Sequence, residues 1–291
     1  MADFETKSST KSMSGMLNVR RTFSYALLVI LTVLSVFPFL ILIVNSSRTH
    51  AAIQTTFTLL PGTKFLSNFT KLVSNENLPI LHSIFNSVYV SLLTAVFSTY
   101  FSTMTAYGIY MYKFKGRGFT FKFIMAVMMV PSQVSACGFL RLMMKMGMLD
   151  NLAALYIPAI ASPVVFFYMY QALESTLPYS IVEAARVDGC NEFRTFNAIV
   201  IPMMKPSIAV QAIFAFVGSW NNYFMPALLI SKKAKKTVPI MIAELRSADY
   251  QSFDLGTVYM EICLAIIPLL IVYLLLSRYI IAGATAGGVK E

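Results

Sequence analysis

The chain has 291 residues, of which 57% are hydrophobic and only 12% are charged, and its formal net charge is +10. Its mean hydropathy is +0.68. Average soluble domains carry about 25% charged residues, so the composition excludes an ordinary soluble domain and favours a protein embedded in a bilayer. Lys and Arg near anionic headgroups account for the positive charge. The sequence has no basic face interleaved with aromatic residues outside the spans, so it does not indicate binding of nucleic acid.

Six runs lack Asp, Glu, Lys and Arg, and a membrane-spanning helix needs about 20 apolar residues. The runs are continuously apolar rather than alternating, which predicts helices rather than strands. We therefore predict an all-α, polytopic membrane protein with one transmembrane domain over residues 22–282. Its six helices are expected at about residues 22–45, 82–112, 119–144, 151–173, 206–231 and 256–281.

The first run has two interpretations, a cleaved signal peptide or a retained span. Its apolar core is too long for a signal peptide, no small-x-small cleavage site follows it, and Arg20 and Arg21 precede it. We expect a retained span, with residues 1–21 and 283–291 as polar tails. An N-terminus in the cytoplasm leaves 13 Lys and Arg residues on the cytoplasmic side and 10 outside. The positive-inside rule then favours cytoplasmic termini, although the lysine cluster at 232–236 opposes it.

Several kinds of chemistry are absent from the sequence. There is no P-loop motif, and the only histidines are His50 and His82, too few for a zinc-protease motif or a plausible catalytic triad. The three cysteines, Cys137, Cys190 and Cys263, lie too far apart to indicate a disulfide framework or a zinc site. We therefore predict no enzyme, with no catalytic residue, no metal and no cofactor bound by this chain.

Charged residues within the predicted spans are nearly absent, although a secondary carrier or a proton pump usually has them near the bilayer midplane. The one candidate is Glu261, near the start of the sixth helix. We expect an interfacial glutamate, because Asp254 and an external loop lie just upstream. A position lining a polar cavity is the alternative.

The segment 174–205, between the fourth and fifth helices, carries mixed charge. Leu177-Pro178 predicts a helix start, capped by Ser175 or Thr176, and Gly189 suits its end. A second short helix is expected from Asn191, with Pro202 and Pro206 ending it. Helix-end arguments leave two interpretations open: an amphipathic hairpin on the headgroups, or a knob that docks another protein.

Residues of this segment resemble the EAA loop of permease subunits of binding-protein-dependent ABC importers. They are Glu183-Ala184-Ala185, Gly189, Ile199 and Pro202, and Asp188-Gly189 with Lys205-Pro206 is similar to the carbohydrate branch. In particular, the chain resembles the maltose-type second permease, which has six helices and the type-1 importer fold. Further stretches agree over about residues 20–290: Ala106-Tyr107-Gly108, Phe114-Lys115-Gly116-Arg117, Gly147-Met148-Leu149-Asp150-Asn151, Trp220-Asn221 and Thr285–Lys290. The chain departs from the pattern at Cys190, which replaces a small Ala, and at Glu261, which replaces a small or apolar residue.

The resemblance implies that the loop 174–205 docks on a cytoplasmic ATPase subunit and transmits its motion to the membrane helices. It implies coupling roles for Glu183 as a polar anchor, Ala184 and Ala185 as a close-contact surface, Asp188, and Gly189 as a bend. The implied partners are a companion permease, two ATPase subunits that bind ATP and Mg, an extracellular solute-binding protein, a sugar and membrane lipids. The implied location is a bacterial or archaeal plasma (inner) membrane.

Polar and aromatic residues within the spans mark a candidate translocation path. They are Gln133 in the third helix and Trp220, Asn221, Asn222 and Tyr223 in the fifth. Asn and Gln could bind sugar hydroxyls, and aromatic rings could stack on sugar faces. Packing between permease subunits through the same amides is the other interpretation.

Together these features predict a permease subunit that moves a sugar, specifically an oligosaccharide, by alternating access while partner subunits hydrolyse ATP. Two alternatives remain. One is the same importer for another polar solute, such as a glycerol-phosphate ester or a peptide. The other is an ATP-independent secondary carrier.

Overall fold

The computed structural model describes residues 2–75, 79–247 and 253–288, and in these ranges the chain forms helices and loops without a strand. Side chains are described for residues 20–277 of these ranges. The α-helices are α1 (Ala2–Ser46), α2 (His50–Thr55), α3 (Phe65–Val73), α4 (Ile80–Met111), α5 (Arg117–Met128), α6 (Ser132–Lys145), α7 (Ala153–Tyr156), α8 (Pro163–Thr176), α9 (Tyr179–Val187), α10 (Glu192–Thr195), α11 (Ile201–Met203), α12 (Lys205–Trp220), α13 (Phe224–Leu229), α14 (Val238–Arg246) and α15 (Leu255–Gly288). Short 3₁₀-helices η1 (Ile157–Ala161) and η3 (Lys233–Lys235) and the π-helix η2 (Phe196–Val200) complete them.

Four helical stretches are long and apolar enough to cross a membrane: Arg20–Ser46, Ile80–Met111, Ala153–Thr176 and Leu255–Ser277. Two bent pairs also pass as apolar spans, α5 with α6 at 97° and Glu192–Met203 with α12 at 81°. If each pair is one span, the described residues hold up to six. The prediction of an all-α, multi-spanning protein is confirmed.

Two of the six expected spans are interrupted. Pro131 lies at the N-terminal boundary of α6 with ψ 130°, in extended backbone, so the chain turns sharply there. The expected span 206–231 is divided in two, because α12 ends at Trp220 and α13 begins at Phe224. Local side-chain bonding favours this break, since Asn222 Oδ1 accepts a hydrogen bond from the backbone N–H of Met225.

The described chain divides into two compact units. The first unit holds residues up to Phe69 together with Asp254–Cys263. In it, Asn68 Nδ2 donates to the carbonyl oxygens of Ser46 and Arg48, at 2.8 and 2.9 Å, which ties α3 to the end of α1.

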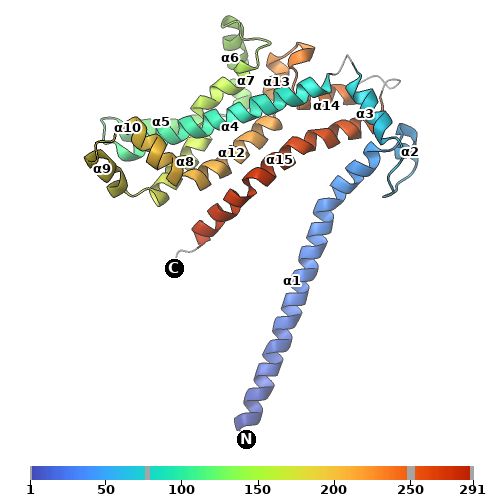
Figure 1. Cartoon of the computed structure of the whole chain (residues 1–291), viewed down its shortest axis with the longest axis horizontal. Coiled ribbons are helices and arrows are strands. Elements are labelled where there is room, and N and C mark those ends of the chain that lie inside the picture. The colour runs from blue at the N-terminus through green and yellow to red at the C-terminus, as the bar shows by residue number, and fades with distance from the viewer. Residues whose placement is uncertain (1, 76–78, 248–252, 289–291) are drawn as a thin grey trace. The chain divides into compact units, whose positions relative to one another are not determined.

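The second unit holds Thr70–Phe253 and the chain from Leu264 onward. Within it α4, α8 and α12 lie side by side (Figure 1). A stripe of small buried residues on α4 allows this close approach of helix backbones: Ser83, Ser87, Ser91, Ala95, Ser98 and Ser102.

The largest apolar cluster of this unit lies beneath α9. It joins α4, α8, α9 and η2 through buried side chains that include Tyr107, Leu173, Val182, Phe196 and Val200. The segment between α8 and α12 is therefore packed against the membrane helices, and does not project as a loose loop.

Candidate functional site

The segment 174–205 folds as α9, a turn, and the run α10–η2–α11. Pro178 precedes α9 in extended backbone, with ψ 139°. No side chain caps the start of α9. The expected caps Ser175 and Thr176 are wrong, because both residues belong to the last turn of α8 and Ser175 Oγ donates to the carbonyl of Ala172. Because Leu177 precedes a proline, it takes extended backbone with ψ 100°, and α8 ends there.

The end of α9 has the geometry of a Schellman motif. Gly189 has φ +75°, in the left-handed region. The N–H of Cys190 donates to the carbonyl of Ala185 at 2.9 Å, and the N–H of Gly189 donates to that of Arg186 at 3.0 Å. These are the two bonds of that motif. The prediction of a helix end with positive φ at Gly189 is confirmed.

The next helix begins where the sequence indicated. Asn191 Oδ1 accepts a hydrogen bond from the N–H of Arg194 at 2.8 Å and so caps α10. Phe196 and Val200 are buried below it. Phe193 is exposed.

The predicted coupling residues lie on opposite faces of α9. Glu183, Ala184, Asp188 and Gly189 are exposed. Ala185 is only 3% exposed, one turn from the fully buried Val182. Residues three apart share a helix face, so Ala185 supports α9 from beneath. Its assignment to the contact surface for a partner stays a prediction, and Ala184 is the alanine of the pair that is exposed.

Hydrogen bonds connect the segment to α4, and the sequence analysis did not anticipate them. Tyr107 Oη donates to Glu192 Oε2 at 3.1 Å, and Tyr100 Oη donates to Asn197 Oδ1 at 3.1 Å. Tyr110 Oη donates to the carbonyl of Leu177, also at 3.1 Å. The regular spacing of the tyrosines on α4 is the one signal in the sequence that could have indicated this contact.

An open cavity of about 1040 Å³ lies at the break between α5 and α6. The elements α7, η1, α8 and the start of α13 complete its wall. Its polar lining is Ser132, Gln133, Ser135 and Asn222, and Phe139 adds an aromatic ring. The structure thus brings together two of the predicted path residues, Gln133 and Asn222.

The other path candidates do not line this cavity. Trp220 is buried and stacks on Phe216, with ring centroids 5.9 Å apart and an interplanar angle of 15°. Tyr223 lines a separate cavity of about 340 Å³ with Lys236 and Glu244. Asn221 is exposed. Its backbone N–H donates to the carbonyl of Val217 at the C-terminal end of α12.

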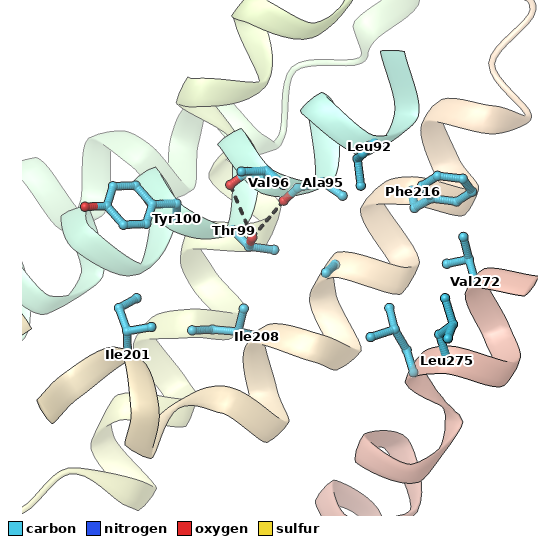
Figure 2. A pocket seen from close by; sticks show the side chains of 12 residues that line it. Leu92, Ala95, Val96, Thr99, Tyr100, Ile201, Ile208, Phe216, Val272 and Leu275 are labelled. Carbon is cyan, nitrogen blue, oxygen red and sulfur yellow. Dashed lines mark hydrogen bonds between the residues drawn. The ribbon is translucent and has the colours of Figure 1, made fainter. Parts of the chain in front are cut away.

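A third cavity, of about 460 Å³, lies between α4, α12 and α15. Figure 2 shows Leu92, Phe216, Val272 and Leu275 facing into it. The hydroxyl of Thr99 turns back to the carbonyls of Ala95 and Val96 (Figure 2). This lining offers hydrocarbon and almost no hydrogen-bonding group, so it does not suit a polar solute.

Glu261 is buried within the protein. It lies in the first unit, its side chain is 0% exposed, and neither carboxyl oxygen has a hydrogen-bond partner among the residues described. Glu261 also lines none of the three cavities above. Sequence position alone could not show this burial, because it depends on how α15 packs.

Asp150 fixes the turn between α6 and α7, where it has φ +56°. Its Oδ1 accepts hydrogen bonds from the backbone N–H groups of Lys232 at 2.8 Å and Ser231 at 2.6 Å. These two donors hold the pKa of the Asp150 carboxyl below its usual range. Lys235 Nζ donates to the backbone carbonyl of Asp150 at 2.7 Å.

Residues 98–284 match the sequence model of a family described as "Binding-protein-dependent transport system inner membrane component". This match covers more than half of the chain. The chain belongs to this family. It is therefore a multi-pass inner-membrane component of an ABC importer and not itself an enzyme, and it works with an ATPase and a solute-binding protein. Among residues 2–75, 79–247 and 253–288, no group of three or more His, Cys, Asp or Glu could hold a metal ion.

Two permeases of known systems are similar along much of the chain. The chain is 35% identical over 264 residues to the arabinooligosaccharides transport system permease protein AraQ of Halalkalibacterium halodurans, covering 88% of this chain and 92% of that protein. It is 37% identical over 210 residues to the protein of the same name from Bacillus subtilis, covering 71% and 72%.

A solved structure has the same fold. A chain of a bacterial ABC transporter involved in the import of the acidic polysaccharide alginate matches with a TM-score of 0.78. The match covers 90% of this permease and 97% of that chain, at 22% sequence identity. The likeness supports the ABC importer permease fold.

Proposed function

We propose that this permease forms half of the membrane pore of an oligosaccharide importer. A companion permease forms the other half, two ATPase subunits bind from the cytoplasm, and an extracellular binding protein delivers the sugar. The N- and C-termini and the segment 174–205 lie on the cytoplasmic side. Similarity to two arabinooligosaccharide permeases supports the class of solute.

The observation that carries the coupling role is the two-faced packing of α9. One face is buried through Val182 and Ala185, and the other exposes Glu183, Ala184 and Asp188. The Schellman turn at Gly189 gives α9 a fixed end. An exposed helix face on a rigid base is suited to receive force from a partner and pass it inward.

Reversal of charge at Glu183 tests the docking role. In the complete importer, Glu183→Lys should reach the membrane normally but lose ATPase binding and uptake. Glu174→Lys is the matched control, because Glu174 is exposed on α8, outside α9. Normal uptake and normal ATPase stimulation in Glu183→Lys would contradict the docking role.

We propose the Gln133–Asn222 cavity as part of the path. Sugars offer hydroxyls for amide side chains and C–H faces for aromatic rings, and this lining supplies both kinds of group. Gln133→Ala should slow uptake without reducing co-purification of the companion. Val134→Ala is the control, since Val134 is exposed and does not line the cavity. Loss of the companion in Gln133→Ala would instead assign this amide to subunit packing.

The solute and the energy source can be tested in one preparation. Purified importer in vesicles should take up arabinose or glucose oligosaccharides only with ATP and the binding protein. A partner ATPase without its catalytic residues should stop uptake. Uptake that continues would indicate a secondary carrier, and preference for a glycerol-phosphate ester or a peptide would overturn the sugar assignment.

The orientation has its own test. A single cysteine at Lys11 should react with a membrane-impermeant maleimide only after cells are permeabilised, and one at Lys233 should react in intact cells. The opposite pattern would contradict cytoplasmic termini.

A further inference from the structure

We propose that three tyrosines of α4, Tyr100, Tyr107 and Tyr110, fasten the coupling segment to α4, with Glu192 as the central acceptor, so that α4 moves with the segment. The proposal rests on the docking of α9 on an ATPase, proposed above. It adds the route by which force leaves the segment.

The tyrosines occupy one side of α4. Tyr100 and Tyr107 are seven residues apart, which is about two helical turns, and Tyr110 lies three residues further. The ring of Phe196 lies 5.6 Å from that of Tyr100 and 5.6 Å from that of Tyr107, between centroids. Phe196 is buried. It therefore contacts both tyrosines and holds η2 against α4.

The hydroxyl groups bond to the beginning, the middle and the end of the segment. Tyr110 binds the carbonyl of Leu177, before α9. Tyr107 binds Glu192, which begins α10, and Tyr100 binds Asn197 in η2. A bond in the reverse direction runs from Tyr179 Oη to the carbonyl of Tyr110 at 3.1 Å, and these two rings stack at 4.8 Å.

Glu192 joins three helices. Its Oε2 accepts from Tyr107 of α4, while its Oε1 accepts from Nε of Arg186 on α9 at 2.8 Å. The Arg186 guanidinium also lies over the ring of Tyr112, 5.4 Å from its centroid. A half-exposed ion pair alone contributes little. Here the ion pair matters for position rather than for stability, because one carboxylate connects α9, α10 and α4.

The covalent connections of the segment do not account for its contact with α4. The chain leaves the segment through α8 and α12, but it turns at Pro178 on one side and bends by 81° before α12 on the other. Turns of this kind can absorb movement. α4 is distant in sequence, so its contact with the segment is entirely non-covalent.

α4 also contacts the elements that form the wall of the Gln133–Asn222 cavity. Tyr89 of α4 meets Tyr156 of α7 edge to face, with ring centroids 5.7 Å apart. Ser102 Oγ donates to the carbonyl of Ser162 at 3.3 Å, next to Ala161 and Pro163 in the cavity wall. α4 thus contacts Glu192 at Tyr107 and the cavity wall at Ser102 and Tyr89.

The test uses Tyr→Phe changes, which keep the rings and remove only the hydroxyls. In the complete importer in vesicles, Tyr100→Phe/Tyr107→Phe/Tyr110→Phe should keep ATPase binding and ATP hydrolysis. Solute moved per ATP hydrolysed should fall by at least about fivefold, the factor that corresponds to the loss of one typical hydrogen bond, since the variant loses three. Tyr168→Phe, at an exposed tyrosine of α8, is the matched control.

Variants at Glu192 sharpen the test. Glu192→Gln has the same shape: its amide oxygen can accept from Arg186, and its amide N–H can donate to Tyr107 Oη. It should therefore keep most of the coupling, whereas Glu192→Ala should lose it. A purely structural role would lower thermal stability in the triple variant and leave solute per ATP unchanged, which would overturn the proposal. Failure of Glu183→Lys to affect docking would refute the proposed docking separately.

Discussion

The carboxylate of Asp150 accepts a 2.6 Å hydrogen bond from the backbone N–H of Ser231, which joins the turn before α7 to the loop after α13. The N–H of Lys232 donates to the same oxygen. Asp150 also has φ +56°, a conformation in which Asp and Asn are more frequent than most other residues with a side chain. The Asp150-Asn151 turn that resembles carbohydrate permeases therefore has a physical reason in this fold.

Asp150→Ala should loosen this connection. Without the carboxylate, the amide protons of Ser231 and Lys232 should exchange with solvent several-fold faster in detergent-solubilised protein. Asp150→Asn keeps one acceptor oxygen and should exchange at an intermediate rate. Equal exchange rates in all three proteins, measured by hydrogen–deuterium exchange, would show that the bonds do not hold the loop.

The same contact should depend on pH. The backbone donors keep the folded-state pKa of Asp150 below the ordinary value of about 3.9. Its stabilising contribution is therefore complete above about pH 4 and is lost as the pH falls through the lower, folded-state pKa. Protection of the Ser231 and Lys232 amides should be constant from about pH 7 to 4 and should decline below that. A decline already at about pH 6, or one that persists in Asp150→Asn, would contradict the assignment.

Gly189→Ala should destabilise the end of α9 through backbone strain alone. Gly189 has φ +75°, and a Cβ built there would meet nothing within 4 Å. The left-handed conformation costs an L-residue about 1–2 kcal/mol. Gly118→Ala is the matched control, because Gly118 also has open space but lies in α5 without a positive φ. Thermal unfolding should show a loss for the first variant and a small gain for the second.

Leu177→Ala should destabilise the base of the segment. Leu177 is 2% exposed in the cluster that joins α4, α8 and α9. Removing a buried leucine side chain typically costs about 2–5 kcal/mol, according to how far the site can collapse. Val187→Ala removes a side chain that is 87% exposed at the end of α9 and should change the free energy of unfolding by much less. Similar losses in both variants would contradict the burial described here.

Features set by nearby residues could be predicted from the sequence. The positive φ of Gly189 and the cap at Asn191 each depend on a turn of a few residues. The helical class follows in the same way, since long apolar runs in a bilayer must satisfy their own backbone. Pro131 is a local signal of the same kind, because a proline disfavours a continuous helix, and the structure has a 97° bend there.

Features that depend on tertiary contacts could not be predicted. Trp220 looked like a path residue, but it faces Phe216 and the core. Ala185 and Ala184 are adjacent and chemically identical, yet only Ala185 is buried, because burial depends on which face of α9 meets α4 and α8. Glu261 shows the same limit, since its burial follows from the packing of α15.

Asn222 has two roles that mutations can separate. It lines the cavity with Gln133, and its Oδ1 accepts from the N–H of Met225 at 3.3 Å in the first turn of α13. Asn222→Ala loses both roles and should lower stability by about 1 kcal/mol, as for other lost helix caps. It should also slow uptake while the companion permease still co-purifies. Asn222→Ser restores a capping oxygen but shortens the side chain, so it should recover stability without recovering uptake. Recovery of both together would assign the residue to capping alone and leave Gln133 as the amide that contacts solute.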